Sequence, residues 1–263
     1  MNIVFSLLFL VLGSIVGSFL NVVILRLNTG RGLGGRSSCM SCSTVLKSKD
    51  LIPIASYVAL GGKCAMCKSK ISLQYPLVEA VTAVVFLLLS KVFMPSVGSV
   101  NASSIFFFTL YAVIFSLLIV ISVYDMRHTI IPDKLVFAFI ILSFLTASFY
   151  FGGAISYQYM LYAVLLAVPF AMLWYISKGK WMGLGDAKLA LGIGFLLGGS
   201  SGALALMFAF WMGAVVAVVS MLLQMGKVKM STEIPFAPFM VLGTLIVFFL
   251  QIDFMGFLSW FMH

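Results

Sequence analysis

The feature that most constrains this chain is a series of long apolar runs separated by short polar segments. A helix that crosses the hydrocarbon core of a bilayer needs about 18–23 apolar residues. The chain offers eight such runs, near residues 3–25, 77–94, 104–124, 135–152, 156–177, 186–200, 202–224 and 236–259. The sixth run is short and rich in glycine. The sequence therefore predicts an all-α polytopic membrane protein with about eight transmembrane helices.

The composition excludes most other classes of protein. Hydrophobic residues make up 63% of the 263-residue chain and charged residues 9%, with a mean hydropathy of +1.19. Soluble domains are about 25% charged, and membrane barrel strands alternate over about ten residues rather than running on. A soluble domain, a disordered chain, a secreted disulfide scaffold and a nucleic-acid-binding domain are all excluded as the main description.

The cations predict the orientation of the helices. With eight spans, fifteen of the 16 Lys and Arg residues fall on one side, and only Lys91 lies near the other. Such an asymmetry marks the cytoplasmic side, so both chain termini are expected outside. The net charge of +9 then reflects orientation and attraction to anionic lipid rather than a nucleic acid. Residues 1–12 lack the basic start of a signal peptide, so we expect the first span to remain.

All four cysteines fall in the longest cytoplasmic loop, as two CxxC pairs formed by Cys39, Cys42, Cys64 and Cys67. Two such pairs at this spacing are typical of a tetrahedral zinc-ribbon site. Disulfides are a poor alternative in the reducing cytoplasm. Four protein ligands leave no open position, so the metal is expected to be structural Zn²⁺. An iron–sulfur centre would use similar ligands and stays open as the second choice.

Five of the seven acidic residues have an ordinary structural interpretation. Asp50 lies in the cysteine loop and Asp253 near the outer end of the last span. Glu79 opens the second span and Glu233 precedes the last, and an acid suits a helix N-terminus in both places. Asp133 is expected to cap the N-terminus of the fourth span.

Asp125 and Asp186 differ from the other acids. Asp125 ends the third span, where a carboxylate meets the negative end of the helix dipole and no capping role explains it. Asp186 follows Gly183 and Gly185 at the start of the sixth span, where it is expected to be either an N-cap or a functional carboxylate. The two glycines are expected to permit irregular backbone beside it.

Together the two aspartates indicate aspartic protease chemistry. Two carboxylates brought to one membrane depth by different helices can share a proton, one acting on water as base and the other as acid. We expect Asp186 to be the ionised base and Asp125 the protonated acid, because they lie at opposite kinds of helix end. The sequence has neither an HExxH nor a GxSxG motif that would favour a different hydrolase.

The sequence resembles the bacterial type IV prepilin leader peptidases, which are GxGD intramembrane aspartyl proteases. Besides the two CxxC pairs, the matching stretches are GSFLNVVILR (17–26), DLIPIASY (50–57), GKCAMC (62–67), ISLQYPLVE (71–79), DMRHTIIPD (125–133), GLGDAK (183–188) and PFAPF (235–239). Many relatives have proline inside the first CxxC and glycine where Ala237 stands. We expect neither departure to touch the chemistry.

The resemblance implies a bifunctional enzyme. It would cut the basic leader from type IV prepilins or pseudopilins at the cytoplasmic face of the inner membrane and N-methylate the new N-terminus with S-adenosylmethionine. The family's catalytic aspartates fall on Asp125 and Asp186, and its metal cysteines on the four cysteines of this loop. Gly62 matches a glycine linked to methylation. Further motif residues that support the site are Gly183, Gly185, Lys188, Glu79 and Pro235.

The implied organisation has three parts: a first transmembrane helix (1–25), a cytoplasmic four-cysteine metal-binding module associated with methyl transfer (26–76), and a protease core (77–263). Glu79, Asp50 or Glu233 are candidates to receive the basic leader. The alternative function is a transporter or channel with intramembrane acids and a structural zinc module. The sequence leaves open the oligomeric state, the pilin that is cut and the residues that hold the methyl donor.

Overall fold

The computed structural model of the protein describes residues 3–30, 32–150, 157–223, 235–254 and 256–257. Helices joined by loops make up this part of the chain, and it contains two isolated β-bridges but no β-strand. The chain divides into two compact units, Met1–Val120 and Ile121–His263. The all-helical class expected from the apolar runs is confirmed.

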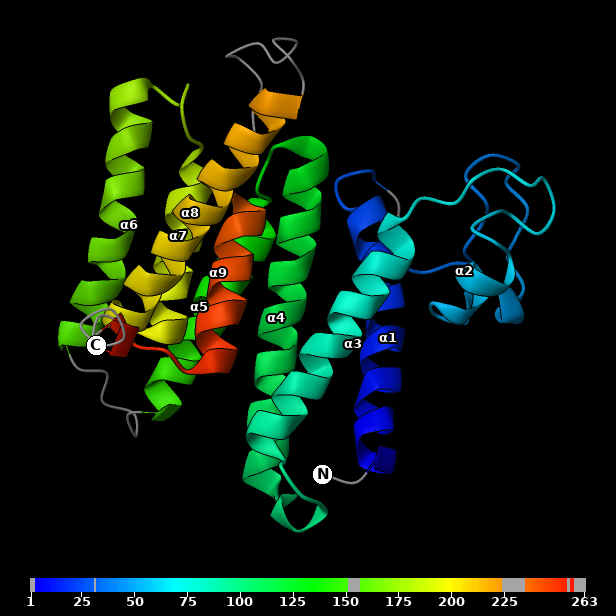
Figure 1. Cartoon of the computed structure of the whole chain (residues 1–263), viewed down its shortest axis with the longest axis horizontal. Coiled ribbons are helices and arrows are strands. Elements are labelled where there is room, and N and C mark those ends of the chain that lie inside the picture. Colours follow the sequence, from blue (N-terminus) through cyan, green and yellow to red (C-terminus); the bar gives the residue numbers. More distant parts are fainter. Residues whose placement is uncertain (1–2, 31, 151–156, 224–234, 255, 258–263) are drawn as a thin grey trace. The chain divides into compact units, whose positions relative to one another are not determined.

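The first unit is built on two long helices that pack against each other. Its elements are α1 (Ile3–Arg26), η1 (Ser48–Leu51), α2 (Ala55–Ala59), α3 (Gln74–Phe93), η2 (Val97–Ser99) and the residues up to 120 of α4 (Ala102–His128). Figure 1 shows α1 and α3 side by side. A Cβ on Gly13 would lie 2.7 Å from the Cα of Ala83, and one on Gly17 would lie 2.7 Å from the Cα of Glu79. Glycine at these positions therefore lets the two backbones meet, as is usual between helices in lipid.

The second unit is centred on a short helix. It contains the end of α4, α5 (Asp133–Tyr150), α6 (Tyr157–Ser177), α7 (Leu184–Leu197), α8 (Gly199–Leu223) and α9 (Ala237–Leu250). Helix α7 packs against α5, α6, α8 and α9. Its glycines make this possible, since a Cβ on Gly194 would lie 2.6 Å from the Cα of Ala163. Most of α7 is buried as a result.

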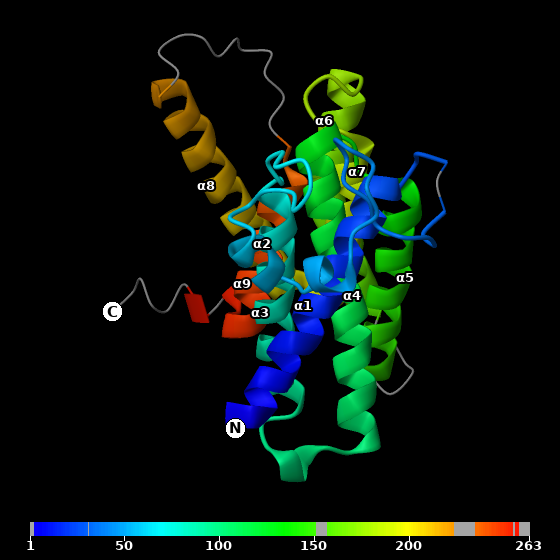
Figure 2. The same ribbon diagram turned by 90° about the vertical axis from the view of Figure 1, so that its right-hand side faces the viewer.

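Helix α8 is buried only in its first half, where it contacts α9. Its buried residues run from Gly202 to Ala209, and a Cβ on Gly243 of α9 would collide with the carbonyl oxygen of Ala205. Figure 2 shows the later half of α8 extending away from α9. The apolar side chains of that half, from Val215 to Leu223, are exposed, as suits contact with lipid.

The long helices follow the eight expected spans in order. Five are long and apolar enough to cross a membrane: α1, α3, α4, α6 from Tyr159, and α8. Helix α9 is a shorter apolar helix. The last span, expected to reach residue 259, ends at Leu250 because Gln251 takes a left-handed conformation with φ 51°. The expected ends at 152, 224 and 259, and the expected start at 156, lie outside the described residues. The protein is an integral membrane protein.

The close contact of α8 with α9 gives a prediction about stability. Gly243→Ala is expected to lower the free energy of unfolding in detergent by about 1–3 kcal/mol, because the new methyl group meets backbone that cannot move aside. Gly213→Ala in α8 is the matched control, since its Cβ would find an ordinary 3.5 Å contact with Phe239. That change should stabilise the protein by about 0.5–1 kcal/mol. Equal effects of the two changes on the free energy of unfolding would contradict the close contact of Gly243 with the backbone of α8.

Candidate functional site

Asp125 lies in the last turn of α4 with its side chain buried. Its carbonyl accepts the N–H of Thr129 at 2.8 Å, and 5% of the residue is exposed. The carboxylate Oδ2 accepts the backbone N–H of Ala237, the first residue of α9, at 3.2 Å. The expectation that no capping role explains Asp125 is therefore wrong, because its carboxylate caps a different helix, 112 residues along the chain.

Asp186 lies in the first turn of α7. The N-cap of this helix is Gly183, with φ −75° and ψ 151°, so Asp186 is not the N-cap. Its N–H donates to the Gly183 carbonyl at 3.2 Å, and only 9% of the residue is exposed. A carboxylate in this position interacts favourably with the positive end of the helix dipole.

The structure brings these two aspartates together. The carboxyl groups of Asp125 and Asp186 interact electrostatically. They come from the end of α4 and the start of α7, and the start of α9 donates a hydrogen bond to one of them. Asp125 lies at the end of α4 and Asp186 at the start of α7, and the start of α9 also faces the Asp125 carboxylate. The assignment of Asp186 as base and Asp125 as acid therefore stays a prediction.

Neither glycine beside Asp186 has an irregular backbone, and Gly185 is required for packing. Gly183 has an extended conformation that other residues also adopt, and Gly185 is helical. A Cβ on Gly185 would lie 2.8 Å from the Cβ of Ile131. Gly185 therefore lets the first turn of α7 approach the loop that precedes α5.

Lys188 pairs with Asp133 and not with the two buried aspartates. Its Nζ lies 2.6 Å from Asp133 Oδ1, and the two side chains are 24% and 64% exposed. The ammonium group also lies 5.0 Å from the centre of the Phe137 ring. Asp133 is the first residue of α5 rather than its N-cap. The pair joins the starts of α5 and α7 at the rim of the site, where an exposed ion pair contributes modestly.

Pro235 belongs to the segment that leads into α9. Phe236 is the N-cap, and Pro238 lies in the first turn, where proline's fixed φ suits a helix start. This geometry aims the N–H of Ala237 at Asp125. Sequence reasoning missed this backbone donor, although Ala237 is fully buried. The expectation that alanine in place of the relatives' glycine leaves the chemistry untouched stays a prediction, because either residue offers the same N–H. The two prolines of the PFAPF stretch are the signal that could have found the donor.

The four cysteines also come together, within the first unit. The Sγ atoms of Cys39, Cys42, Cys64 and Cys67 all lie within 4.8 Å of one another, and those of Cys39 and Cys67 are 3.8 Å apart. Tetrahedral zinc–thiolate bonds of about 2.3 Å place sulfur atoms about 3.8 Å apart. The cluster therefore has the size that a four-thiolate metal site needs.

Each CxxC pair is folded by the same two backbone hydrogen bonds. In the first, the N–H of Cys39 donates to the carbonyl of Thr44 at 3.0 Å, and that of Ser43 donates to Cys39 at 2.9 Å. The corresponding bonds of the second are Cys64 N–H to Ser69 O at 2.9 Å and Lys68 N–H to Cys64 O at 3.1 Å. The residue after each second cysteine is left-handed, with φ 57° at Ser43 and 60° at Lys68. Two copies of one turn thus face each other.

The surroundings of two thiols, Cys39 and Cys67, favour the thiolate form that a metal requires, whereas burial and the neighbouring thiols raise the pKa of the Cys64 thiol. The backbone N–H groups of Cys42 and Ser41 lower the pKa of the Cys39 thiol to about 6. The Ser69 hydroxyl, 3.1 Å from the sulfur of Cys67, lowers the pKa of that thiol. Deprotonated sulfur is the ligand form, so both groups suit metal binding near neutral pH.

Gly62 is one of the few positions where glycine is required. Its φ is +68°, and a Cβ there would lie 2.9 Å from the Tyr57 hydroxyl. Its N–H donates to the Tyr57 carbonyl at 2.9 Å, and its own carbonyl accepts the N–H of Ile71 at 2.8 Å. Any side chain at position 62 would disturb the turn beside Cys64.

The remaining described acids lie outside α4 and α7. Glu79 lies inside α3, five residues after its start at Gln74, rather than at the helix N-terminus as expected. Asp50 accepts the N–H of Lys47 at 3.2 Å, and Asp253 accepts that of Gly256 at 2.8 Å. Glu233 lies outside the described residues.

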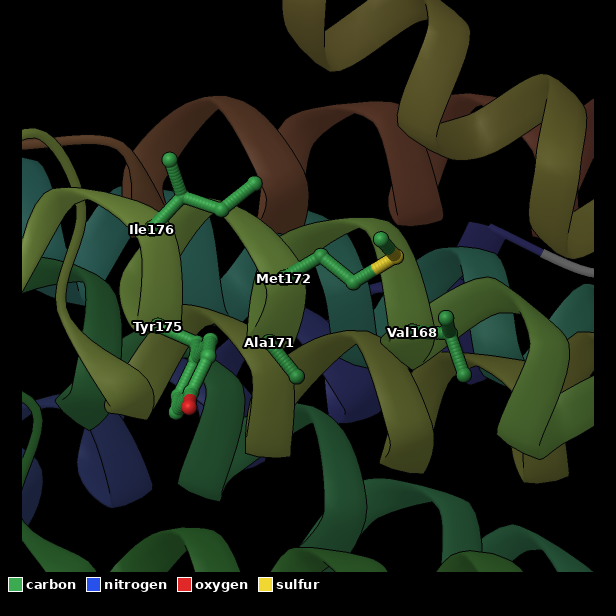
Figure 3. A pocket seen from close by; sticks show the side chains of 5 residues that line it. All are labelled: Val168, Ala171, Met172, Tyr175 and Ile176. Atoms are coloured by element: carbon green, nitrogen blue, oxygen red, sulfur yellow. The ribbon is translucent and has the colours of Figure 1, made fainter.

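A shallow hollow on α6 carries no chemistry of its own. It is lined by Val168, Ala171, Met172, Tyr175 and Ile176, whose side chains all project from that one helix (Figure 3). None of these residues is charged, and most are exposed. This is the surface of a lipid-facing helix rather than a reaction site.

Comparison with known proteins agrees with this geometry. Residues 11–93 match the Bacterial Peptidase A24 N-terminal domain, and residues 112–218 match the Type IV leader peptidase family. These matches contain the cysteine cluster and both buried aspartates, respectively. The comparison with solved structures finds no match.

Several curated relatives are similar over most of their length. The prepilin leader peptidase/N-methyltransferase of Bacillus subtilis is 33% identical, over 92% of this chain and 93% of the relative. The protein of the same name in Pseudomonas aeruginosa is 28% identical, over 91% and 88%. The type 4 prepilin-like proteins leader peptide-processing enzyme of Escherichia coli is 30% identical, over 91% of both. The chain therefore belongs to the type IV leader peptidase family.

Proposed function

We propose that this protein cleaves the leader peptide of type IV prepilins or pseudopilins and N-methylates the residue that cleavage exposes. The observation that carries the proposal is the buried pair formed by Asp125 and Asp186 at the ends of two helices. The names of the similar proteins support both activities. They favour a hydrolase over the alternative of a transporter or channel.

The proposed cleavage uses the two carboxyl groups as one acid–base pair. Two buried carboxyl groups that repel each other in this way cannot both ionise cheaply, so in this proposal the pair holds a single proton and titrates as a unit. The ionised carboxylate takes a proton from water, whose oxygen attacks the scissile carbonyl, while the protonated carboxyl donates to the carbonyl oxygen. The tetrahedral intermediate then collapses: one of its hydroxyl groups returns a proton to the pair, the C–N bond breaks, and the leaving amine takes a proton from the pair, which again holds one.

In this mechanism Ala237 orients the pair. Its N–H binds one oxygen of Asp125 and so leaves the other oxygen for the shared proton. Gly185 and the Lys188–Asp133 ion pair hold the first turn of α7, which carries Asp186. We propose these three as positioning groups and the two aspartates as the catalytic residues.

We propose that cleavage takes place at the cytoplasmic face of the inner membrane, with both chain termini outside. The distribution of cations supports this orientation. Among those cations, Arg31, Lys227 and Lys229 lie outside the described residues. A prepilin with a basic leader inside and an apolar helix in the lipid would present its scissile bond at this interface.

We propose that the four cysteines hold one structural Zn²⁺ and that residues 26–76 form the module associated with methyl transfer, beside a first helix at 1–25 and a protease core at 77–263. The sulfur geometry and the thiolate character of Cys39 and Cys67 support the metal. S-adenosylmethionine would supply an electrophilic methyl group. Gly62 maintains the turn beside Cys64, and we propose that it supports methylation in this way.

Asp125→Asn and Asp186→Asn are each expected to lower prepilin cleavage about 10²–10⁴-fold, because each change removes one partner of the acid–base pair. Purified variants in detergent, assayed with a prepilin substrate, provide the measurement. Asp253→Asn is the control, since this exposed carboxylate only accepts a local N–H and should retain full activity. Cleavage retained by Asp125→Ala would end the proposal.

The two activities are expected to be separable. Asp186→Asn should still methylate a pilin that has already been cut, because methyl transfer needs no acid–base pair for peptide hydrolysis. The measurement is transfer of labelled methyl groups from S-adenosylmethionine to a pre-cut pilin. If this variant lost methylation as well as cleavage, the two-site interpretation would be wrong.

Metal analysis of the purified protein is expected to find one zinc per chain. Cys39→Ser should lose it, because a hydroxyl replaces one of four thiolate ligands. Ser41→Ala, between the first two cysteines, should keep it. A wild-type protein without metal, or one with bound iron, would contradict the assignment of zinc.

A further inference from the structure

Glu79 is a buried acid with partners in two other segments of the first unit. It lies on α3 with 6% of the residue exposed. Its Oε2 accepts the backbone N–H of Ile54 at 2.7 Å, and the Ser18 hydroxyl of α1 donates to the same carboxylate. A buried carboxylate is costly unless it is hydrogen-bonded in this way. Three segments thus meet at one side chain.

Ile54 has a strained backbone. Its φ of 59° and ψ of −51° lie in a region that a β-branched residue rarely enters. The N–H of Ala55 donates to the carbonyl of Pro53 at 2.5 Å, which closes a γ-turn around Ile54. This kind of turn is rare, and it persists only where its surroundings hold it in place.

The bond from Ile54 to Glu79 supplies that support. It is short, it is charge-assisted, and it fixes the N–H of the strained residue itself. At the same level, Gly17 brings α1 so close that a Cβ there would lie 2.7 Å from the Cα of Glu79. The carboxylate is therefore fixed between two packed helices before it binds Ile54.

A continuous series of contacts leads from Ile54 to the metal cluster. Ile54 precedes α2, and Tyr57 of α2 accepts the N–H of Gly62. Gly62 in turn bonds to Ile71 and lies two residues before Cys64. A change in the conformation of Ile54 would move α2 and with it the turn of the second CxxC pair.

We propose that Glu79 is a positioning residue that holds the γ-turn at Ile54 and so fixes the cysteine module on α3. Its carboxylate is directed at a backbone N–H inside the protein. Glu79 therefore orients the module that serves methyl transfer, and leader cleavage does not depend on it. The claim about methyl transfer rests on the proposed function, whereas the claim about the turn does not.

Hydrogen exchange in the full-length protein tests the turn directly. Glu79→Leu keeps the volume but removes the acceptor, and amides 56–62 are expected to exchange about tenfold faster. Adding Ile54→Gly should return their exchange to within about twofold of wild type, because glycine adopts this conformation without strain. If Glu79 stabilised only the contact of α1 with α3, the change at Ile54 would not restore the exchange rates of these amides.

Two matched controls sharpen this experiment. Ile52→Gly should not rescue Glu79→Leu, because Ile52 has an ordinary extended backbone with φ −66° and ψ 117°. Glu79→Gln keeps an oxygen acceptor and should exchange within about threefold of wild type. Unchanged exchange in Glu79→Leu, or equal rescue by both glycines, would overturn the proposal. If Glu79→Leu fails to accumulate in membranes, accumulation of the double variant with Ile54→Gly supports the proposal, and its failure overturns it.

The same variants test the consequence for activity. Glu79→Leu is expected to lower methylation of a pre-cut pilin about tenfold and prepilin cleavage less than about twofold, with methylation restored by Ile54→Gly. Equal loss of both activities would overturn the assignment to methyl transfer. If the wild-type protein showed neither activity, the proposed function would fail, while the exchange experiment would still report on the turn.

Discussion

The hydrogen bond from the backbone of Ala237 to Asp125 is the interaction on which the second unit depends. Inside a membrane every backbone N–H needs a partner, and the first amides of a helix have none within that helix. Asp125 lies in the last turn of α4, and its carboxylate accepts one such amide at the start of α9. This hydrogen bond gives a partner both to the amide of α9 and to the carboxyl group, so an acidic side chain can be buried here beside a second acid.

Glycine allows the helices to reach this arrangement. Gly185 leaves room for Ile131 beside the turn that carries Asp186. Gly194 leaves room for the backbone of α6, and Gly243 for the backbone of α8. In lipid the association of helices gains little from apolar burial, so close approach and polar contacts decide which helices meet. The same device joins α1 to α3 through Gly13 and Gly17 in the first unit. Close packing at glycine therefore shapes the helices of both units.

Much of this organisation could be predicted from local sequence. The order of the long helices follows from apolar runs, and the metal cluster follows from the spacing of Cys39, Cys42, Cys64 and Cys67, since both signals are short in range. The contacts of Asp125 with Ala237 and of Glu79 with Ile54 span 112 and 25 residues and depend on packing that no periodicity reports. The start of α3 was missed because Ser72 and Gln74 interrupt the apolar pattern there, although Pro76 in the first turn marks it.

A main-chain donor has a particular genetic consequence. Exchanging the side chain at position 237 leaves the N–H in place, so alanine and glycine serve Asp125 equally well, and a scan of alanine variants would never reveal the contact. Proline alone deletes the donor. The identity of the residue there can therefore vary among related enzymes while the bond it makes stays constant, and the selective pressure falls on the prolines and packing that set the direction of the peptide plane.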